Sequence, residues 1–219
     1  MNRRQLLRNT GQYLTALSLM TASKGQAARS TQKIKVGQIG TLHAHASGKM
    51  ATLRKLKDVF EVVGIVETNP DQRRKMRDHS AYRGLNWLTE EQLLNTRGLQ
   101  AVAVETSIPE LVPTGLRCVS AGMHLHLDKP AGLSLAEFRA LLNDATRRKL
   151  TVQMGYMFRA NPAFKFCFQA VRNGWLGDVF EVDGVISKTI DARRRQELAM
   201  YTGSMFELGC HLCLSLVVI

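Results

Sequence analysis

The sequence predicts an α/β protein built on a doubly wound parallel β-sheet. Short apolar runs alternate with segments of helical period over about 120 residues, as they do in folds with a parallel sheet. The first run, 34–39, is half β-branched and has no helical period, which is typical of a strand buried on both faces. A glycine separates it from the next helical segment, as in parallel βαβ units.

The first strand and helix form the turn that the rest of the chain is organised around. Gly40 ends the strand, and residues 44–56 carry apolar side chains at helical spacing. Such a turn directs backbone N–H groups and the positive end of the helix dipole at a pyrophosphate. The full dinucleotide-binding fingerprint has glycine at positions 40, 42 and 45, of which this chain has the first. The cofactor-binding candidates in this Rossmann-type turn are Gly40, Thr41, Leu42 and His43.

A second strand is expected at 60–66, ended by the acidic residue Glu67. Glu67 comes about 20 residues after the fingerprint, where a dinucleotide fold has the acid that binds the adenosine ribose. A carboxylate there favours NAD over NADP, because it repels a 2′-phosphate. Arg73 and Arg74 follow closely and leave NADP as the alternative.

The remaining elements continue the alternation. A charged surface helix is expected at 70–82, and Thr89 is a suitable cap for another short helix. The further strands are predicted at 99–104, 123–127 and 150–156, and the helices between them at 110–120 and 134–148.

The segment Asp128-Lys129-Pro130 follows a predicted strand, at the sheet edge where ligands bind in such folds. A lysine at this place can hydrogen-bond a substrate hydroxyl, and its charge lowers the barrier to removing the hydroxyl proton. Pro130 restricts the turn that directs the lysine. Thr106, after another predicted strand, is a further cofactor-binding candidate, as are Asp128 and Lys129.

Five segments between about Lys33 and Leu212 together resemble one family, the Gfo/Idh/MocA oxidoreductases. They are the Gly40 turn, Asp128-Lys129-Pro130 (a Glu-Lys-Pro signature in the family), 155–162 with the letters GYMFRANP, 177–182 with the letters GDVFEV, and 207–211 with the letters ELGCH. The last segment is similar to the family's Asp-x-Gly-x-His catalytic segment, with Glu207 in place of aspartate. Their order and spacing make the resemblance specific.

The resemblance implies a nicotinamide-dependent oxidoreductase that acts on a sugar, cyclitol or related polyol, with NAD as cofactor and NADP as the alternative. Lys129 would hold and polarise the reacting hydroxyl, and His211 would exchange its proton, a role suited to imidazole. Glu207 would orient that imidazole or contact the substrate. Arg159 resembles the basic residue near the cofactor, and no metal ion is expected.

The resemblance also implies two domains. Residues 28–157 would form the NAD(P)-binding Rossmann domain, and 177–182 would be the first strand of a substrate domain. The family's substrate domain is a large open antiparallel sheet, so 158–219 would be an incomplete one, and we expect weak activity at best. The apolar end of the chain leaves a homo-oligomer open.

Residues 1–27 resemble a twin-arginine export signal. Arg3 and Arg4 precede two leucines, a mildly apolar stretch follows, and small residues occur near 25–27. We therefore expect export to the periplasm. The alternative is a basic tail on a cytoplasmic protein.

The composition argues against two classes of partner. The formal charge is +12, and four basic residues of it belong to the first 27. The other basic residues are scattered or in short runs without interleaved aromatics, so we expect no nucleic-acid partner. No run reaches the roughly 18 apolar residues of a transmembrane helix, so no membrane insertion is expected.

Two other interpretations remain. A degenerate, non-catalytic nucleotide-binding module would explain Leu42, since a fold does not guarantee a function. A metal-dependent hydrolase would use His43-Ala44-His45 as metal ligands, with His124, His126 and Asp128 as further ligands. The chain has too few strands for the eight-stranded barrel of such hydrolases, which makes this the weakest of the three.

Overall fold

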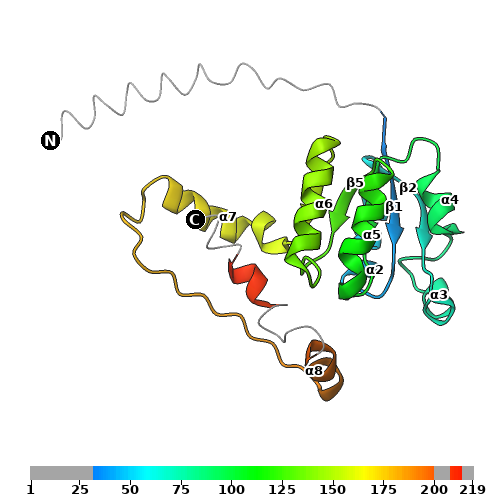
Figure 1. Ribbon diagram of the computed structural model, residues 1–219. Helices are drawn as coiled ribbons and strands as arrows, with labels where there is room; N and C mark the ends of the chain where they lie inside the picture. The colour runs from blue at the N-terminus through cyan, green and yellow to red at the C-terminus, as the bar shows by residue number, and fades with distance from the viewer. Residues whose placement is uncertain (1–31, 200–207, 214–219) are drawn as a thin grey trace, which may run out of the picture. The chain divides into compact units, whose positions relative to one another are not determined.

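The computed structural model describes residues 32–199 and 208–213 (Figure 1). The predicted export signal at 1–27 and the candidate Glu207 lie outside these residues. Six parallel strands form one sheet in the order β3-β2-β1-β4-β5-β6. The direction of winding reverses between β1 and β4, which is the switch point of a Rossmann-type fold. The predicted fold class is confirmed.

Strand β1 (Ile34–Ile39) occupies the centre of the sheet, between β2 (Phe60–Val66) and β4 (Ala101–Val104). Its last four residues are buried, because helices cover both faces of the sheet at this point. Both ends of β1, and both ends of β2, lie where the sequence predicts them.

The helices divide between the two faces of the sheet. Helices α2 (Ala46–Lys55) and α3 (Pro70–Arg77) cover one face, and α4 (Glu90–Leu94), α5 (Ile108–Ser120) and α6 (Leu135–Arg147) cover the other. Right-handed crossovers that run in opposite directions from β1 and β4 put their helices on opposite faces. Figure 1 shows α5 and α6 packed side by side.

Each face has its own apolar core. The larger core, under α5 and α6, includes Val104, Leu111, Leu127 and Leu141. The smaller core, under α2 and α3, contains Met50, Ile65, Ala81 and Tyr82. Ile65 and its neighbour Val66 belong to different cores, because successive strand residues point to opposite faces. Each fully buried large aliphatic side chain contributes about 1.5–3 kcal/mol.

The structure adds one short strand and moves several boundaries. Strand β3 (Trp87–Leu88) was not predicted, because two residues carry no periodic signal; it exists through pairing with the end of β2. The last two strands, β5 (His124–Leu127) and β6 (Val152–Met154), are shorter than predicted. Helix α3 ends at Arg77 instead of continuing to residue 82. The predicted cap Thr89 is confirmed, since it forms a reciprocal capping box with Gln92.

Beyond the sheet the chain forms a 3₁₀ helix, η1 (Met157–Ala160), helices α7 (Pro162–Arg172) and α8 (Ala192–Ala199), and a helical segment at 208–213. The predicted strand at 177–182 is wrong, because 177–191 contain no strand. A strand requires a neighbour to satisfy its backbone, and none of the described segments pairs with this one. Phe180 and Val185 are consequently 95% and 86% exposed.

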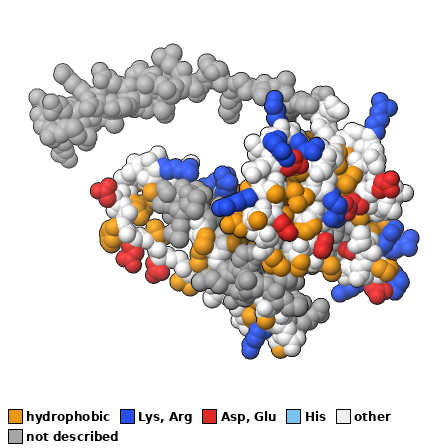
Figure 2. Space-filling model, viewed as in Figure 1, with side chains coloured by type: hydrophobic (Ala, Val, Ile, Leu, Met, Phe, Trp, Pro, Cys, Tyr) orange, Lys and Arg blue, Asp and Glu red, His pale blue; other side chains and the backbone are white. Residues whose placement is uncertain are grey.

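The described surface carries charged side chains of both signs. Figure 2 shows Lys and Arg side chains interspersed with Asp and Glu on the face that it draws. Within the described ranges, no helix combines the length and apolarity needed to cross a bilayer.

Candidate cofactor and substrate site

Gly40 makes the tight turn after β1. Its φ of +90° lies in the region that favours glycine. A Cβ at this position would lie 2.7 Å from the backbone nitrogen of Thr106 and 2.8 Å from the carbonyl of Glu105. The ends of β1 and β4 thus approach so closely that only glycine fits, and Thr106 lies against the turn.

Replacing Gly40 by alanine is expected to lower the free energy of unfolding by about 2–3 kcal/mol, through backbone strain and the clash with Thr106. Gly48, inside α2, is the matched control, because a Cβ added there would have no neighbour within 4 Å. Gly48→Ala should raise the free energy of unfolding by about 0.5–1 kcal/mol. Urea denaturation measures both, and effects of the same sign would contradict the prediction.

The rest of the turn departs from the glycine fingerprint. The Leu42 side chain is 53% exposed at the position of the second glycine. Helix α2 begins at Ala46, two residues later than predicted, and His45 precedes it without a side-chain cap. The His45 imidazole instead reaches Asp128, with Nδ1 lying 3.1 Å from Oδ2.

Glu67, the predicted ribose-binding acid, is buried at the end of β2. Its Oε2 accepts hydrogen bonds from the Thr41 backbone nitrogen at 2.9 Å and from the Thr41 hydroxyl at 2.7 Å. Its Oε1 accepts one from the backbone nitrogen of Asn69 at 3.0 Å. A carboxylate has roughly four acceptor positions, so Glu67 both holds the turn in shape and retains capacity for a ribose hydroxyl.

The two arginines that could favour a 2′-phosphate are engaged elsewhere. Arg73 donates to the carbonyl of Trp87 at 3.3 Å, and its guanidinium carbon lies 5.6 Å from the centre of the Trp87 ring. Arg74 pairs with Asp71 of the same helix. These contacts place both guanidinium groups along α3 and β3.

Lys129 follows β5 and is 3% exposed. It lines a cleft of about 580 Å³ together with Leu42 and His43 from the turn after β1. His211, from the helical segment at 208–213, lines the same cleft. The two residues predicted to act on the substrate, 82 positions apart in sequence, therefore come to one cavity that also includes the cofactor turn.

His211 is 5% exposed, with its ring packed against aromatic side chains. The centre of the Phe158 ring lies 4.9 Å away, and that of Tyr156 lies 6.0 Å away. Both aromatics belong to the GYMFRANP segment, so this motif positions the imidazole. Arg159 of the same segment is exposed on η1 and is not among the described residues that line the cleft.

Asp128 lies under the cleft instead of lining it. Its carboxylate is fully buried and accepts a hydrogen bond from the Lys129 backbone nitrogen at 2.6 Å. Lys49 of α2 donates to the same carboxylate at 2.5 Å. A Cβ on Gly155 would lie 2.6 Å from Oδ1, so the glycine of GYMFRANP makes room for this carboxylate. Asp128 thus supports Lys129 from below, and the predicted cofactor contact remains a prediction.

Asp128 belongs to a group of charged and imidazole side chains below Lys129, which also contains His43, His45, Lys49 and Glu105. The sequence analysis did not identify Lys49 and Glu105 as members of this buried group. Lys49 Nζ lies 2.8 Å from Glu105 Oε1, and Glu105 is fully buried. Burial raises the pKa of Glu105 to about 8, against the lowering effect of Lys49. Burial alone would raise the pKa of Asp128, but His43, His45 and Lys49 outweigh it and hold that pKa well below its usual value. The one sequence feature that could have identified Glu105 is its position as a charged residue directly after β4.

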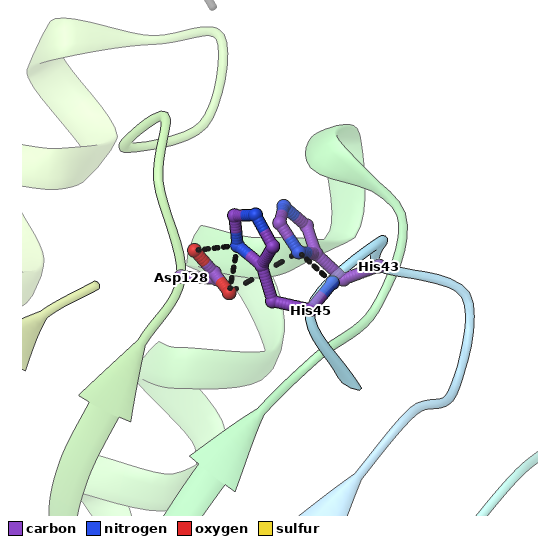
Figure 3. A group of neighbouring side chains, drawn as sticks. All are labelled: His43, His45 and Asp128. Carbon is purple, nitrogen blue, oxygen red and sulfur yellow. Dashed lines mark hydrogen bonds and ion pairs between the residues drawn. The ribbon is translucent and has the colours of Figure 1, made fainter. Parts of the chain in front are cut away.

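Figure 3 shows His43, His45 and Asp128 directed at one another. The Nδ1 atoms of both rings lie 3.1 Å from Asp128 Oδ2. These residues are three of the five ligands that the hydrolase interpretation names, and the expectation of no metal ion did not include their convergence. His124 and His126, the other ligands of the hydrolase interpretation, are not part of this group. The pKa of His126 is lowered to about 4, chiefly because the side chain is buried.

A family profile described as "Oxidoreductase family, NAD-binding Rossmann fold" matches residues 34–156, more than half of the chain. The chain belongs to the Gfo/Idh/MocA oxidoreductase family. The resemblance drawn from the five sequence segments is confirmed.

Two curated relatives illustrate the range of the match. The uncharacterised oxidoreductase ORF334 of Rhizobium meliloti is 24% identical over 180 residues, which are 81% of this chain and 53% of that protein. The myo-inositol 2-dehydrogenase of Thermotoga maritima is 26% identical over 148 residues, which are 66% of this chain and 41% of that protein. The chain therefore spans about half the length of these relatives.

Solved structures of similar proteins share the fold. An NAD-binding protein from Listeria innocua superposes with a TM-score of 0.66 at 21% identity, covering 85% of this chain and 54% of that one. The scyllo-inositol dehydrogenase of Lactobacillus casei, solved with NAD(H) and scyllo-inositol, superposes with a TM-score of 0.58 at 18% identity. That comparison covers 67% of this chain and 43% of the other.

The geometry of this Gfo/Idh/MocA chain fits a dinucleotide. Gly40 keeps the backbone of the turn bare at the switch point, where a side chain would collide with Thr106. Glu67 lies at the end of β2 with acceptor capacity to spare. Leu42 and His45 replace the other two glycines of the fingerprint; Leu42 is 53% exposed, and the His45 imidazole is directed at Asp128. Gly40, Thr41 and Glu67 are the residues that would hold the cofactor.

Proposed function

We propose that the chain is a nicotinamide-dependent oxidoreductase that acts on a secondary alcohol of a sugar, cyclitol or related polyol. The observation that carries this proposal is the common cleft of Lys129, His211 and the turn after β1. The family supports it, since the relatives named above include inositol dehydrogenases. The chain spans only part of the length of these relatives. The activity is therefore proposed for the whole protein to which this sequence belongs.

The proposed roles follow from the chemistry of the two side chains. The Lys129 ammonium donates a hydrogen bond to the substrate hydroxyl and stabilises negative charge on its oxygen. The His211 imidazole accepts the hydroxyl proton during oxidation and returns it during reduction. When bound, the nicotinamide ring supplies the acceptor or donor for the hydride. Oxidation of the alcohol thus removes one hydride from the carbon, which the nicotinamide would accept, and one proton from the hydroxyl, which His211 would accept.

The domain boundaries are part of the same proposal. Residues 28–157 act as the NAD(P)-binding domain, and 158–219 belong to the substrate domain. The second part contributes Phe158 and His211 to the cleft. Cofactor binding thus depends on the first part and substrate positioning on both.

For the cofactor, we expect NADH to bind more tightly than NADPH. Glu67→Ser should reduce this preference, because it removes the charge that repels a 2′-phosphate and leaves Thr41 without its acceptor. Titration of the purified protein with each reduced nucleotide, followed by nicotinamide fluorescence, measures both affinities.

Glu61→Ser is the control for this experiment, since Glu61 lies at the other end of β2 in an exposed ion pair with Lys35. It should leave both affinities unchanged. Tighter binding of NADPH by the unchanged protein would show that Arg73 and Arg74 outweigh the acid, against their observed contacts.

A non-catalytic nucleotide-binding module is the second candidate, favoured by Leu42 at the fingerprint's second position. This candidate predicts nucleotide binding without turnover. Assays with NAD and a panel of sugars and cyclitols distinguish the two functions.

We also propose that residues 1–27 direct export by the twin-arginine route, which places the protein in the periplasm. Changing Arg3 and Arg4 to lysine should retain the protein in the cytoplasm, because that route reads the arginine pair. Cell fractionation of the two forms provides the measurement. Equal periplasmic amounts would refute this localisation.

A further inference from the structure

The buried group below Lys129 contains three side chains of the kinds that bind metal ions, two histidines and an aspartate. His43, His45 and Asp128 each offer an atom to a group in which all lie within 4.8 Å of one another. The separations from each imidazole Nδ1 to Asp128 are 3.1 Å at the shortest. Ligands held about 2.0–2.2 Å from a tetrahedral zinc ion lie roughly 3.3–3.5 Å apart, so little movement is required.

The hydrogen bonds of His43 direct a lone pair into this group. Its Nε2 faces the carbonyl oxygen of Lys129 at 3.0 Å, an acceptor that requires a proton on Nε2. Its Nδ1 faces both Asp128 Oδ2 and the backbone N–H of His45, at 3.1 and 3.3 Å. In the neutral ring, Nδ1 accepts from His45 and offers its lone pair to an ion beside Asp128, whereas an imidazolium would donate Nδ1–H to Asp128. A bond from the far nitrogen to a backbone carbonyl is also the usual support of a metal-binding histidine.

Glu105 provides a second, independent observation. Its carboxylate is fully buried, and Oε2 accepts no hydrogen bond from any residue that the structure describes. This oxygen lies 3.7 Å from His43 Nδ1. An ionised oxygen in this buried position would need a donor or a cation, and a divalent ion bound to His43 would supply one.

Lys49 is the cation that the chain itself supplies. Its ammonium contacts Asp128 at 2.5 Å and Glu105 at 2.8 Å. The Lys49 side chain is 21% exposed, so it has a route to solvent that the two carboxylates lack. A divalent ion would therefore exchange with an ammonium already in place, and it would not need to enter an unneutralised cavity.

We propose that His43, His45 and Asp128, with Glu105 beside them, bind a first-row divalent transition-metal ion that displaces Lys49. Two imidazoles and a carboxylate suit zinc, iron(II) or cobalt(II) better than magnesium or calcium, which prefer oxygen ligands. The site lies on the chain's own residues and needs no nicotinamide. His43 is hydrogen-bonded to the Lys129 carbonyl, so an ion bound to His43 would also fix the position of Lys129, the lysine of the proposed reaction.

The test uses the full chain, freed of any affinity tag and treated with a chelator, and titrates it with Co²⁺ and Zn²⁺. Co²⁺ should develop visible absorption bands at one equivalent per chain, and Zn²⁺ should remove them by competition. His45→Gln should weaken Co²⁺ binding by about 10–100-fold, and its half-exposed side chain makes a folding failure avoidable. Lys49→Met should act in the opposite direction and tighten binding, because the competing ammonium is gone.

His124→Gln is the matched control, since His124 is an exposed histidine at the start of β5 outside the group. It should bind Co²⁺ as the unchanged protein does. The proposal is overturned if no saturable Co²⁺ signal arises, if His45→Gln and His124→Gln bind equally, or if Lys49→Met binds no more tightly. Nucleotide titration of the same samples is a separate readout, so failure of this site and failure of the proposed function are distinguishable.

Discussion

Replacing Asp128 by asparagine is expected to lower the free energy of unfolding by about 3–5 kcal/mol. The carboxylate is fully buried, and it is the shared partner of Lys49, His43 and His45. Asparagine preserves the shape but removes the charge, so Lys49 loses its closest counter-ion. Among the described residues, Lys49 then keeps only Glu105, at 2.8 Å, and the two imidazoles lose their buried counter-ion, which together account for most of the expected cost.

The measurement is urea denaturation in the presence of a chelator, so that metal binding does not contribute to stability. For a domain of this size, the expected loss corresponds to a fall in Tm of roughly 10 °C. Asp144→Asn is the control, because Asp144 pairs with Arg147 and Arg148 on the surface of α6. Exposed pairs contribute about 0–1 kcal/mol, so a loss in Asp128→Asn no larger than in Asp144→Asn would show that the buried group is not a unit.

Lys129→Met and His211→Ala are each expected to lower kcat by about two to four decades in a protein that turns over. Methionine retains the length of the lysine side chain but cannot donate to the substrate hydroxyl. Alanine at 211 removes the proton acceptor and leaves the Phe158 and Tyr156 rings without their neighbour. Steady-state kinetics with NAD and a competent polyol provide the measurement.

Two further readouts separate chemistry from folding. His211→Ala should retain NADH affinity, because His211 is not among the cofactor-binding candidates. Lys165→Met, at an exposed lysine of α7, should leave kcat unchanged. A loss smaller than tenfold in Lys129→Met or in His211→Ala would remove that residue from the proposed mechanism.

The sequence by itself determined the sheet and most of its helices. The strands at 34–39 and 60–66, the turn at Gly40 and the helix cap at Thr89 are all encoded by residues close together in the chain. Hydrophobic period and capping chemistry act over a few residues, so they can be recognised without coordinates. The motifs that resemble the family are of the same local kind, and the family profile confirms the family over residues 34–156.

Only the tertiary structure decided how the site is assembled. Strand β3 depends on pairing with β2, and the segment 177–182, predicted as a strand, finds no partner among the described residues. The sequence predicts that Glu67 binds the ribose, but it does not show the bonds of Glu67 to Thr41, which connect residues 26 positions apart.

The buried group below Lys129 depends still more on long-range contacts. Asp128 meets His43 and His45 from more than 80 positions away, and Glu105 enters from a third strand. Local periodicity carries no information about which strand ends meet at the switch point, because the winding of the sheet brings them together. The sequence therefore determined which residues could act, and the sheet topology decided which of them act together.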